Sequence, residues 1–271
     1  MRRPQSENAV AVKPLWSHLF AAPNSNKTRL AQSFRAEKVT CPSSSGPACR
    51  GRRSRRDRLF IGFRQGLLHA TTYVIDIVAL GDAAFMTPGC ESSWTMQSVL
   101  ESTAVPKVVF DIRSQSNALF TLFGVRLGNI HEIQLMEVAC RPTSRVYVSG
   151  LVKCVWTCPG LDDADKQHWV SRKAHYRELC NPAYGGDDAL LERRPIEPAV
   201  VNMCATNIES LPILWDTYKA QNGGLSMKRI LTATRERIAA SQASDYKTQG
   251  KHMTFAPPSL QVRRASFGRY R

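Results

Sequence analysis

Short apolar runs rich in β-branched and aromatic residues alternate with amphipathic segments through the middle of the chain. Apolar runs bounded by turn residues predict strands, and apolar positions three or four residues apart predict helices. On this basis we predict strands at 58–63, 72–78, 108–111 and 133–138, and helices at 94–102, 116–123, 162–179 and 199–220. Strands that alternate with helices and are followed by helices alone are typical of an α/β fold.

The segment from Lys107 to Phe120 (KVVFDIRSQSNALF) places polar residues directly after a predicted strand. Val108 to Phe110 form the apolar run, Asp111 ends it, and the next residues have the spacing of an amphipathic helix. The carboxyl end of a strand, beside the start of a helix, is where α/β domains present the polar groups of their sites. We therefore expect the functional site to include this segment.

The positive charge of the chain is concentrated at its two ends. The 271 residues carry a net charge of +15, and residues 1–58 hold 13 Lys and Arg against 3 Asp and Glu, while residues 219–271 hold 11 against 2. The middle, 59–218, holds 13 against 17. Basic ends around a weakly acidic domain indicate contact with a polyanion, because Lys and Arg gain affinity by releasing its counterions. Solvated, disordered ends or targeting sequence explain the same charge equally well.

Residues 1–58 have the composition of a disordered basic leader, since five prolines and a Ser-rich run at 43–47 interrupt any long pattern. The run at 50–58 (RGRRSRRDR) is of the kind used for nuclear import or nucleic-acid contact. The basic, acid-poor first 40 residues also fit a mitochondrial transit peptide. We expect an intracellular protein of the nucleus or the mitochondrion. No apolar stretch reaches the roughly 18 residues of a membrane span, so no membrane is expected as a partner.

The eight cysteines are spread along the chain without a Cys-x-x-Cys pair. Cys154 and Cys158 are four residues apart, and His168 and His175 lack the tight spacing of a zinc knuckle. We therefore predict free thiols rather than a disulfide framework or a zinc site.

Five segments, in order, carry a resemblance to a known family. They are Thr72 to Gly89 (TYVIDIVALGDAAFMTPG), Leu100 to Arg113 (LESTAVPKVVFDIR), Ala118 to Leu127 (ALFTLFGVRL), Glu132 to Glu137 (EIQLME) and Arg194 to Ile196 (RPI). Together they resemble the 3′–5′ exonuclease domain of the ribonuclease D type, within the DEDD superfamily, and especially its fungal branch. The resemblance covers 59–218. It implies a ribonuclease H-like mixed sheet flanked by helices, here with its first strands truncated, between the leader 1–58 and a basic, mostly disordered tail at 219–271.

The resemblance also implies a chemistry, two-metal phosphodiester hydrolysis, in which four carboxylates hold two Mg²⁺ or Mn²⁺ ions. The first motif of the family is Asp-x-Glu on the first strand. If Leu59 to Gly66 (LFIGFRQG) is that strand, Gly62 and Arg64 stand in place of the two acids. In an alternative alignment this segment is the second strand and the first motif is absent.

The other two motifs of the family also lack their acids in this chain. Gln115 stands where the second motif has its aspartate, and Asn117 replaces a neighbouring acid. The third motif, Tyr-x-x-x-Asp on the last helix, becomes Met203-x-x-x-Asn207 within Met203 to Pro212 (MCATNIESLP). Neutral amides do not supply the negative charge that hard divalent cations need. We therefore expect no metal cofactor and no intact catalytic residue.

These substitutions leave three interpretations open. The first is a protein of the exonuclease family that binds nucleic acid, DNA or RNA and single-stranded, without cutting it, with Arg113 and Asn117 on the phosphate backbone. The second is an active 3′–5′ exonuclease whose site is rebuilt, with Asp111 as a compensating acid. The third is a non-enzymatic scaffold that uses its basic tails. Drift after loss of function, or a faulty gene model, explains the lost acids as well as retained binding does.

Overall fold

The computed structural model describes residues 32–38, 59–65, 71–89, 93–142, 144–222 and 224–261. The expectations for the leader 1–58 fall outside these ranges, except at 32–38, and those for the last ten residues also fall outside them. None of the helices within the described ranges has both the length and the apolar character that crossing a membrane requires.

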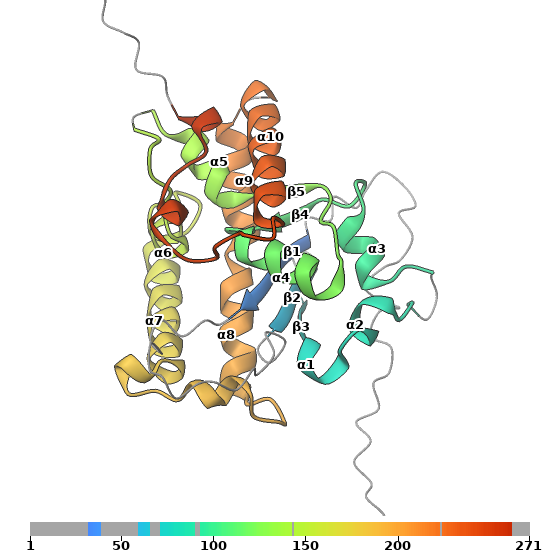
Figure 1. Ribbon diagram of the computed structural model, residues 1–271. Helices are drawn as coiled ribbons and strands as arrows, with labels where there is room; N and C mark the ends of the chain where they lie inside the picture. Colours follow the sequence, from blue (N-terminus) through green and yellow to red (C-terminus); the bar gives the residue numbers. More distant parts are fainter. Residues whose placement is uncertain are drawn as a thin grey trace, which may run out of the picture.

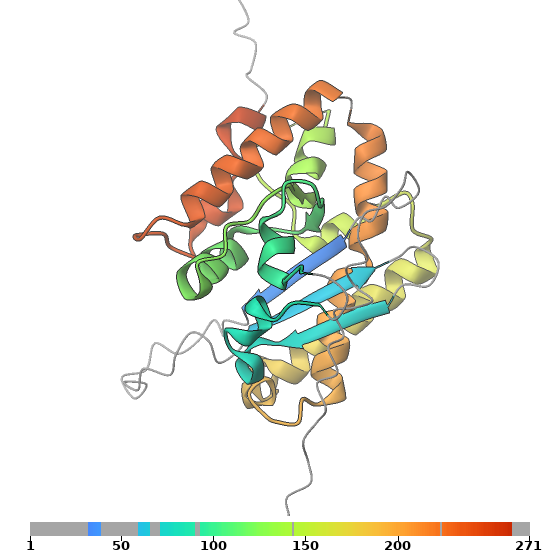
Figure 2. The same cartoon turned by 90° about the vertical axis from the view of Figure 1, so that its right-hand side faces the viewer.

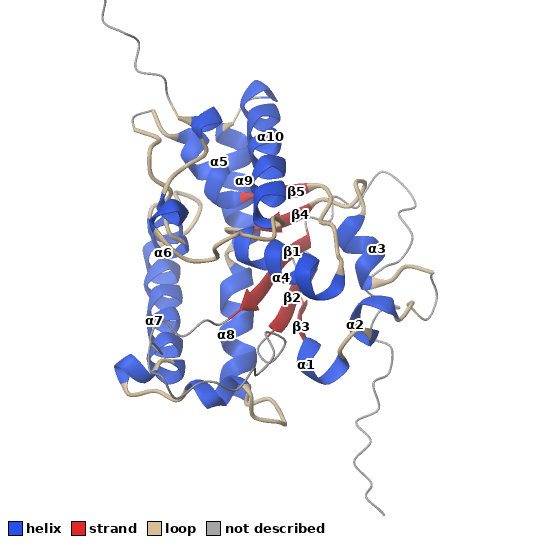
Figure 3. Ribbon diagram, in the orientation of Figure 1, coloured by secondary structure: helices blue, strands red, loops and turns tan. Residues whose placement is uncertain are grey.

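A five-stranded mixed sheet lies at the centre of the molecule (Figure 3). Its strands are β1 (Gln32–Lys38), β2 (Leu59–Gln65), β3 (Thr71–Asp76), β4 (Lys107–Val109) and β5 (Ile130–Glu132), in the order β3-β2-β1-β4-β5. β1 runs antiparallel to β2 and parallel to β4, so the central strand joins the antiparallel and the parallel halves of the sheet. Figure 2 shows β1, β2 and β3 side by side, with α7 (Asp163–Cys180) and α8 (Pro198–Glu209) behind them.

The predicted α/β fold with a mixed sheet and flanking helices is confirmed, but the expected truncation of the first strands is wrong. β1 supplies the strand that we expected to be missing, and it comes from the segment assigned to a disordered leader. It pairs with β2 and with β4, which are distant in sequence. Its own residues, QSFRAEK, are largely polar, so no apolar run marks this strand.

The remaining helices enclose the sheet (Figure 1). They are α1 (Ile77–Leu80), α2 (Ala83–Met86), α3 (Met96–Glu101), α4 (Arg113–Phe123), α5 (Ile133–Cys140), α6 (Leu151–Trp156), α9 (Leu211–Gln221) and α10 (Gly224–Ser241), with the short 3₁₀ turns η2 (Pro182–Tyr184), η3 (Asp188–Leu191), η4 (Lys251–Thr254) and η5 (Pro258–Leu260). The predicted end of the 116–123 helix is confirmed. Gly124 follows α4 with φ +68°, and its N–H donates to the carbonyl oxygens of Leu119 and Phe120.

The strand predicted at 133–138 is wrong, because these residues form α5. Six of its eight residues are buried, including the polar Gln134. An element that is buried on nearly all sides has a continuous apolar run, and such a run does not distinguish a helix from a strand. The strand of this region is the three-residue β5, directly before the helix.

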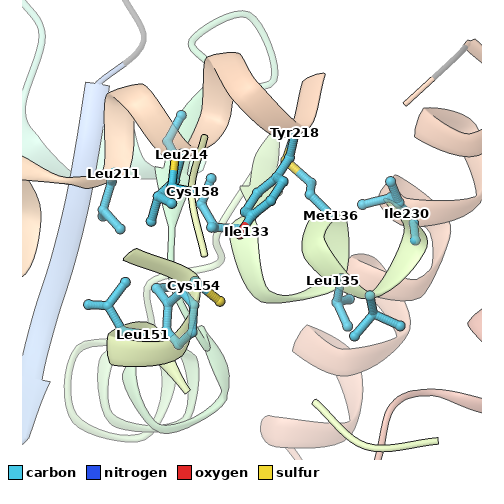
Figure 4. Packing of buried hydrophobic residues seen from close by; sticks show 14 of the residues in the cluster. Ile133, Leu135, Met136, Leu151, Cys154, Cys158, Leu211, Leu214, Tyr218 and Ile230 are labelled. Carbon is cyan, nitrogen blue, oxygen red and sulfur yellow. The ribbon is translucent and has the colours of Figure 1, made fainter. Parts of the chain in front are cut away.

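The largest of three apolar clusters within the described ranges includes the C-terminal helices (Figure 4). It brings together Ile133, Leu135 and Met136 of α5, Leu211, Leu214 and Tyr218 of α9, and Ile230 and Ala233 of α10. Helix α10 also contacts α4, α5 and β5. The boundary predicted at residue 218 is therefore wrong, since residues 219–261 complete the fold instead of forming a disordered tail.

Five cysteines of the described ranges, Cys140, Cys154, Cys158, Cys180 and Cys204, are free thiols. The prediction of free thiols is confirmed for them, and Cys41, Cys49 and Cys90 lie outside the described residues. Burial raises the pKa of Cys154 to about 12, so this thiol is a packing residue of the core rather than a nucleophile.

A fully buried lysine links β4 to the end of α3. The ammonium of Lys107 donates to the carbonyl oxygens of Val99, at 3.1 Å, and Ser102, at 2.6 Å. The last turn of a helix leaves its carbonyls without their usual i+4 partner; Val99 also accepts from the N–H of Ser102 at 3.3 Å. Burial lowers the pKa of Lys107 from its ordinary 10.5 to about 8.

The lowered pKa of Lys107 predicts a pH-dependent stability. Between about pH 8 and 10.5 the unfolded chain holds a proton that the folded chain has lost, so the contribution of this group to stability rises with pH. We expect the free energy of unfolding of the wild type, relative to that of Lys107→Met, to rise across this range by up to about 1.4 kcal/mol per pH unit. Urea titrations at several pH values measure it, with the exposed Lys228→Met as control. Parallel profiles for wild type and Lys107→Met would contradict it.

Candidate functional site

The candidate site starts where β4 ends and α4 begins. Asp111 has φ +51°, and α4 has no side-chain cap of its own. The carboxylate of Glu132, at the end of β5, accepts hydrogen bonds from the backbone N–H groups of Asp111, at 2.7 Å, and Ile112, at 2.8 Å. This carboxylate from the neighbouring strand therefore caps the first turn of α4.

Glu132 is fully buried and lies 3.5 Å from the guanidinium of Arg237 on α10. Burial raises the pKa of Glu132, while Arg237 and the two backbone N–H groups act in the opposite direction. Arg237 also donates to the side-chain oxygen of Gln134 at 3.0 Å. The polar core beneath the candidate site is thus joined to the C-terminal helix.

Arg113 and Asp111 form a two-pronged ion pair, with N–O distances of 2.6 and 2.8 Å. The same guanidinium donates to the carbonyl oxygen of Met253 at 2.9 Å, and Arg113 is only 6% exposed. We expected Arg113 to contact a phosphate backbone, but its Nε and Nη2 groups donate inside the protein. Asp111, which we expected as a possible compensating acid, is the carboxylate partner of Arg113 in this ion pair.

Asn117 was also expected to contact nucleic acid, and the structure gives it a different partner. It is buried, and its side-chain N–H donates to the carbonyl oxygen of Ser241 at 2.9 Å. Ser241 is the last residue of α10, so Asn117 ties the end of this helix to α4. This contact stabilises the fold and presents no group to a ligand.

Helix α8 carries the residues that match the third motif, and α7 lies against it. Asn207 is fully buried, and its side-chain oxygen accepts a hydrogen bond from the ammonium of Lys173 on α7. Met203 is packed in an apolar cluster with Cys180, Leu191, Val200 and Cys204, among others. The place of the family's water-orienting tyrosine is therefore filled by apolar packing.

Two further contacts hold α7 against α8. The indole N–H of Trp169 donates to the carbonyl oxygen of Thr206 at 2.8 Å, and Arg172 forms an ion pair with Glu209. Glu209 is thus engaged with a cation of α7. It does not replace the acid that is missing at Asn207.

Gln115 lies in the first turn of α4 and is largely buried. Its side-chain oxygen has no hydrogen-bond partner within the described part of the chain. Both α4 and α8 contact β1, so the second and third motif positions flank the central strand of the sheet. This arrangement places Gln115 and Asn207 on the two helices that contact β1.

The first strand of the sheet, β1, is one that the sequence analysis did not find. β2 pairs antiparallel with β1, and Gly62 lies opposite Arg35 and Val74, so the segment 59–65 is the second strand. The structure agrees with the part of the alternative alignment that makes 59–65 the second strand, and Gly62 and Arg64 therefore do not lie on the first strand. The first strand reads Arg35-Ala36-Glu37, which has the spacing of Asp-x-Glu with Arg in the first position. Glu37, two residues after Arg35, is the sequence signal by which this strand could have been found.

These residues do not fit a two-metal centre. Asn207 already accepts a hydrogen bond from an ammonium, Gln115 offers a neutral amide, and Asp111 is paired with Arg113. No group of three or more His, Cys, Asp or Glu side chains within the described ranges is arranged to hold a metal ion. Hard divalent cations require clustered anionic oxygen ligands, so we derive no hydrolytic step for this site.

The geometry can be compared with solved structures. The crystal structure of Trypanosoma brucei RNase D in complex with GMP matches with a TM-score of 0.56 and 14% identity, over 81% of this chain and 60% of that chain. The chain has the ribonuclease D fold. The complex of the same enzyme with RNA U12 matches with a TM-score of 0.56 and 15% identity, over 87% of this chain and 70% of that chain. No protein-family model and no curated protein matches the chain.

Proposed function

We propose that this chain is a nucleic-acid-binding protein of the 3′–5′ exonuclease family, of the fungal type, that has lost metal-dependent hydrolysis. The fold and the solved RNase D complexes with GMP and RNA U12 support a nucleic-acid ligand. The residues at the motif positions support the loss of hydrolysis, because Gln115, Met203 and Asn207 hold no negative charge. The preferred ligand is a single strand, because the exonuclease fold acts on chain ends.

The hydrogen bond from Lys173 to Asn207 carries this proposal. In the family a carboxylate at this place on the last helix binds a metal ion, which in turn contacts a phosphate. Here a fixed ammonium stands beside the amide, so positive charge is present at α8 without any bound ion. Lys is a point-charge donor for phosphate groups, and Lys173 is partly exposed. We assign this ammonium, which also has partners within the protein, as a phosphate contact that does not depend on a metal.

Binding and cleavage of a labelled single-stranded oligonucleotide test the proposal. We expect the full-length chain to bind it with the same affinity in EDTA as in Mg²⁺ or Mn²⁺, and to leave it intact. Lys173→Ala is expected to weaken binding and to lower the slope of log affinity against log salt by about 0.7, the value for one phosphate contact on a single strand. Lys166→Ala on the same helix, which pairs with Asp163, is the matched control.

Three outcomes would contradict the proposed function. Metal-dependent shortening of the oligonucleotide from its 3′ end would establish an active exonuclease with a rebuilt site instead. Absence of binding at low salt would leave a scaffold as the better interpretation. Binding that is abolished by EDTA without cleavage would show that a metal ion, rather than Lys173, supplies the positive charge.

A further inference from the structure

An exposed aromatic pair lies outside the candidate site, where two distant segments of the chain meet. The rings of Tyr147 and Phe255 are 5.3 Å apart between centroids and inclined at 32°. Tyr147 is 58% exposed and Phe255 is 44% exposed, so both rings present much of their surface to solvent. Large exposed apolar groups that lie together mark interaction sites.

The backbone holds this pair in a fixed position. Residues 147 and 255 form an antiparallel β-bridge, in which the N–H of Val148 donates to Thr254 at 2.9 Å and the N–H of Ala256 donates to Val146 at 2.8 Å. The segment after α10 thereby runs alongside the turn that precedes α6 (Figure 1). A guanidinium N–H of Arg141 also donates to the carbonyl oxygen of Tyr147 at 2.6 Å. A ligand that stacks on these rings would not have to order them first.

The two stretches of the chain that meet at this pair contain basic residues and no Asp or Glu. The chain has no Asp or Glu between Glu137 and Asp162, and none after Asp245, and the two acid-free stretches meet at the bridge. Besides Arg141, which pairs with Glu137, the described parts of these stretches contribute four Lys and Arg side chains, Arg145, Lys153, Lys247 and Lys251. Within the described ranges none of the four forms an ion pair with a carboxylate.

Two of these cations are close to the rings along the chain. Arg145 is two residues from Tyr147, and Lys251 is four residues from Phe255. Because an extended chain spans at most about 3.6 Å per residue, the Cα atom of Arg145 lies within about 7 Å of that of Tyr147. The Cα atom of Lys251 lies within about 14 Å of that of Phe255. Aromatic rings beside unpaired cations are the combination that binds single-stranded nucleic acid, because bases stack on the rings and phosphates contact the cations.

We propose that Tyr147 and Phe255 form a platform on which bases of single-stranded nucleic acid stack, with Arg145 and Lys251 on the adjoining phosphates. This inference rests on the proposed function, since it assigns a second contact surface for the same ligand. The platform would accept any nucleotide sequence, because every base has a π-face and no hydrogen-bonding group of the rings is required.

Affinity for a single-stranded oligonucleotide, measured with the full-length chain, tests the platform. Loss of one stacked base corresponds to about a 5- to 150-fold loss of affinity. We expect Tyr147→Ala and Phe255→Ala each to lose at least about fivefold, and Tyr147→Phe to retain wild-type affinity. The exposed Tyr184→Ala is the control, because this aromatic residue is 54% exposed and lies in η2.

The salt dependence separates stacking from charge. The aromatic variants are expected to keep the wild-type slope of log affinity against log salt, whereas Lys251→Ala lowers it by about 0.7. Wild-type binding with unchanged affinity in Tyr147→Ala and in Phe255→Ala would overturn the platform and leave the proposed function standing. If the wild type itself does not bind, the proposed function and the platform are both wrong. Circular dichroism verifies that each variant is folded.

Discussion

Replacement of Arg237 by Met is expected to lower the free energy of unfolding by about 3–5 kcal/mol. The substitution leaves the fully buried carboxylate of Glu132 without its cation, and an uncompensated buried charge is among the most destabilising changes in a protein. It also removes the donor that Gln134 accepts from. Urea unfolding at neutral pH, followed by circular dichroism, measures the loss.

Two variants separate the charge from the loss of packing. Arg235→Met, an exposed position on the same helix, is expected to change stability by no more than about 0.5 kcal/mol. Combining Arg237→Met with Glu132→Gln removes both charges and keeps one of the two acceptor oxygens that face the N–H groups of Asp111 and Ile112. This double variant is therefore expected to recover part of the loss. A cost below about 1 kcal/mol for Arg237→Met alone would show that the ion pair does not hold α10 to the sheet.

Restoring a metal site should require more than restoring the two amides to acids. We expect Gln115→Asp with Asn207→Asp to gain no Mn²⁺ binding, because Lys173 would pair with the new carboxylate and residue 35, which we propose as the first position of the first motif, is an arginine. Adding Lys173→Ala and Arg35→Asp is expected to create a site. Thermal stabilisation would then reach about 2.7 kcal/mol when Mn²⁺ is at about 100 times its dissociation constant.

Thermal unfolding and isothermal calorimetry with Mn²⁺ measure this difference. Asn202→Asp, on the exposed side of the same helix, adds one acid without placing it beside Lys173 and serves as the control. Tight binding of two Mn²⁺ ions by the wild type would contradict the interpretation. Equal binding by the double and quadruple variants would show that Lys173 and Arg35 do not oppose the metal.

Much of the fold was predictable because its helices and strands follow from local patterns of apolar and polar residues. The apolar run before Asp111 and the amphipathic residues before Gly124 predict β4 and α4, and the structure confirms both. The helix predicted at 199–220 is two helices, α8 and α9, which meet at Ser210. The identities at 115, 203 and 207 are likewise properties of the sequence, and they alone establish that these motif positions carry no acid.

Other features required the tertiary structure. β1 has a polar sequence, and it is a strand because β2 and β4 supply its hydrogen bonds. The run at 133–138 is a helix because it is buried on nearly all sides, where strand and helix patterns coincide.

For the polar residues, too, the sequence predicts which chemical group is present, and only the structure shows its partner. Arg113 and Asn117 follow a strand end, where a ligand contact is the natural expectation, yet their partners are Met253 and Ser241, 140 and 124 residues further along the chain. The sequence by itself determined which chemical groups stand at the strand end and on the last helices. Only the tertiary structure decided which of these groups are already engaged, because a buried donor takes whichever acceptor the fold brings within about 3 Å, and local sequence carries no record of that neighbour.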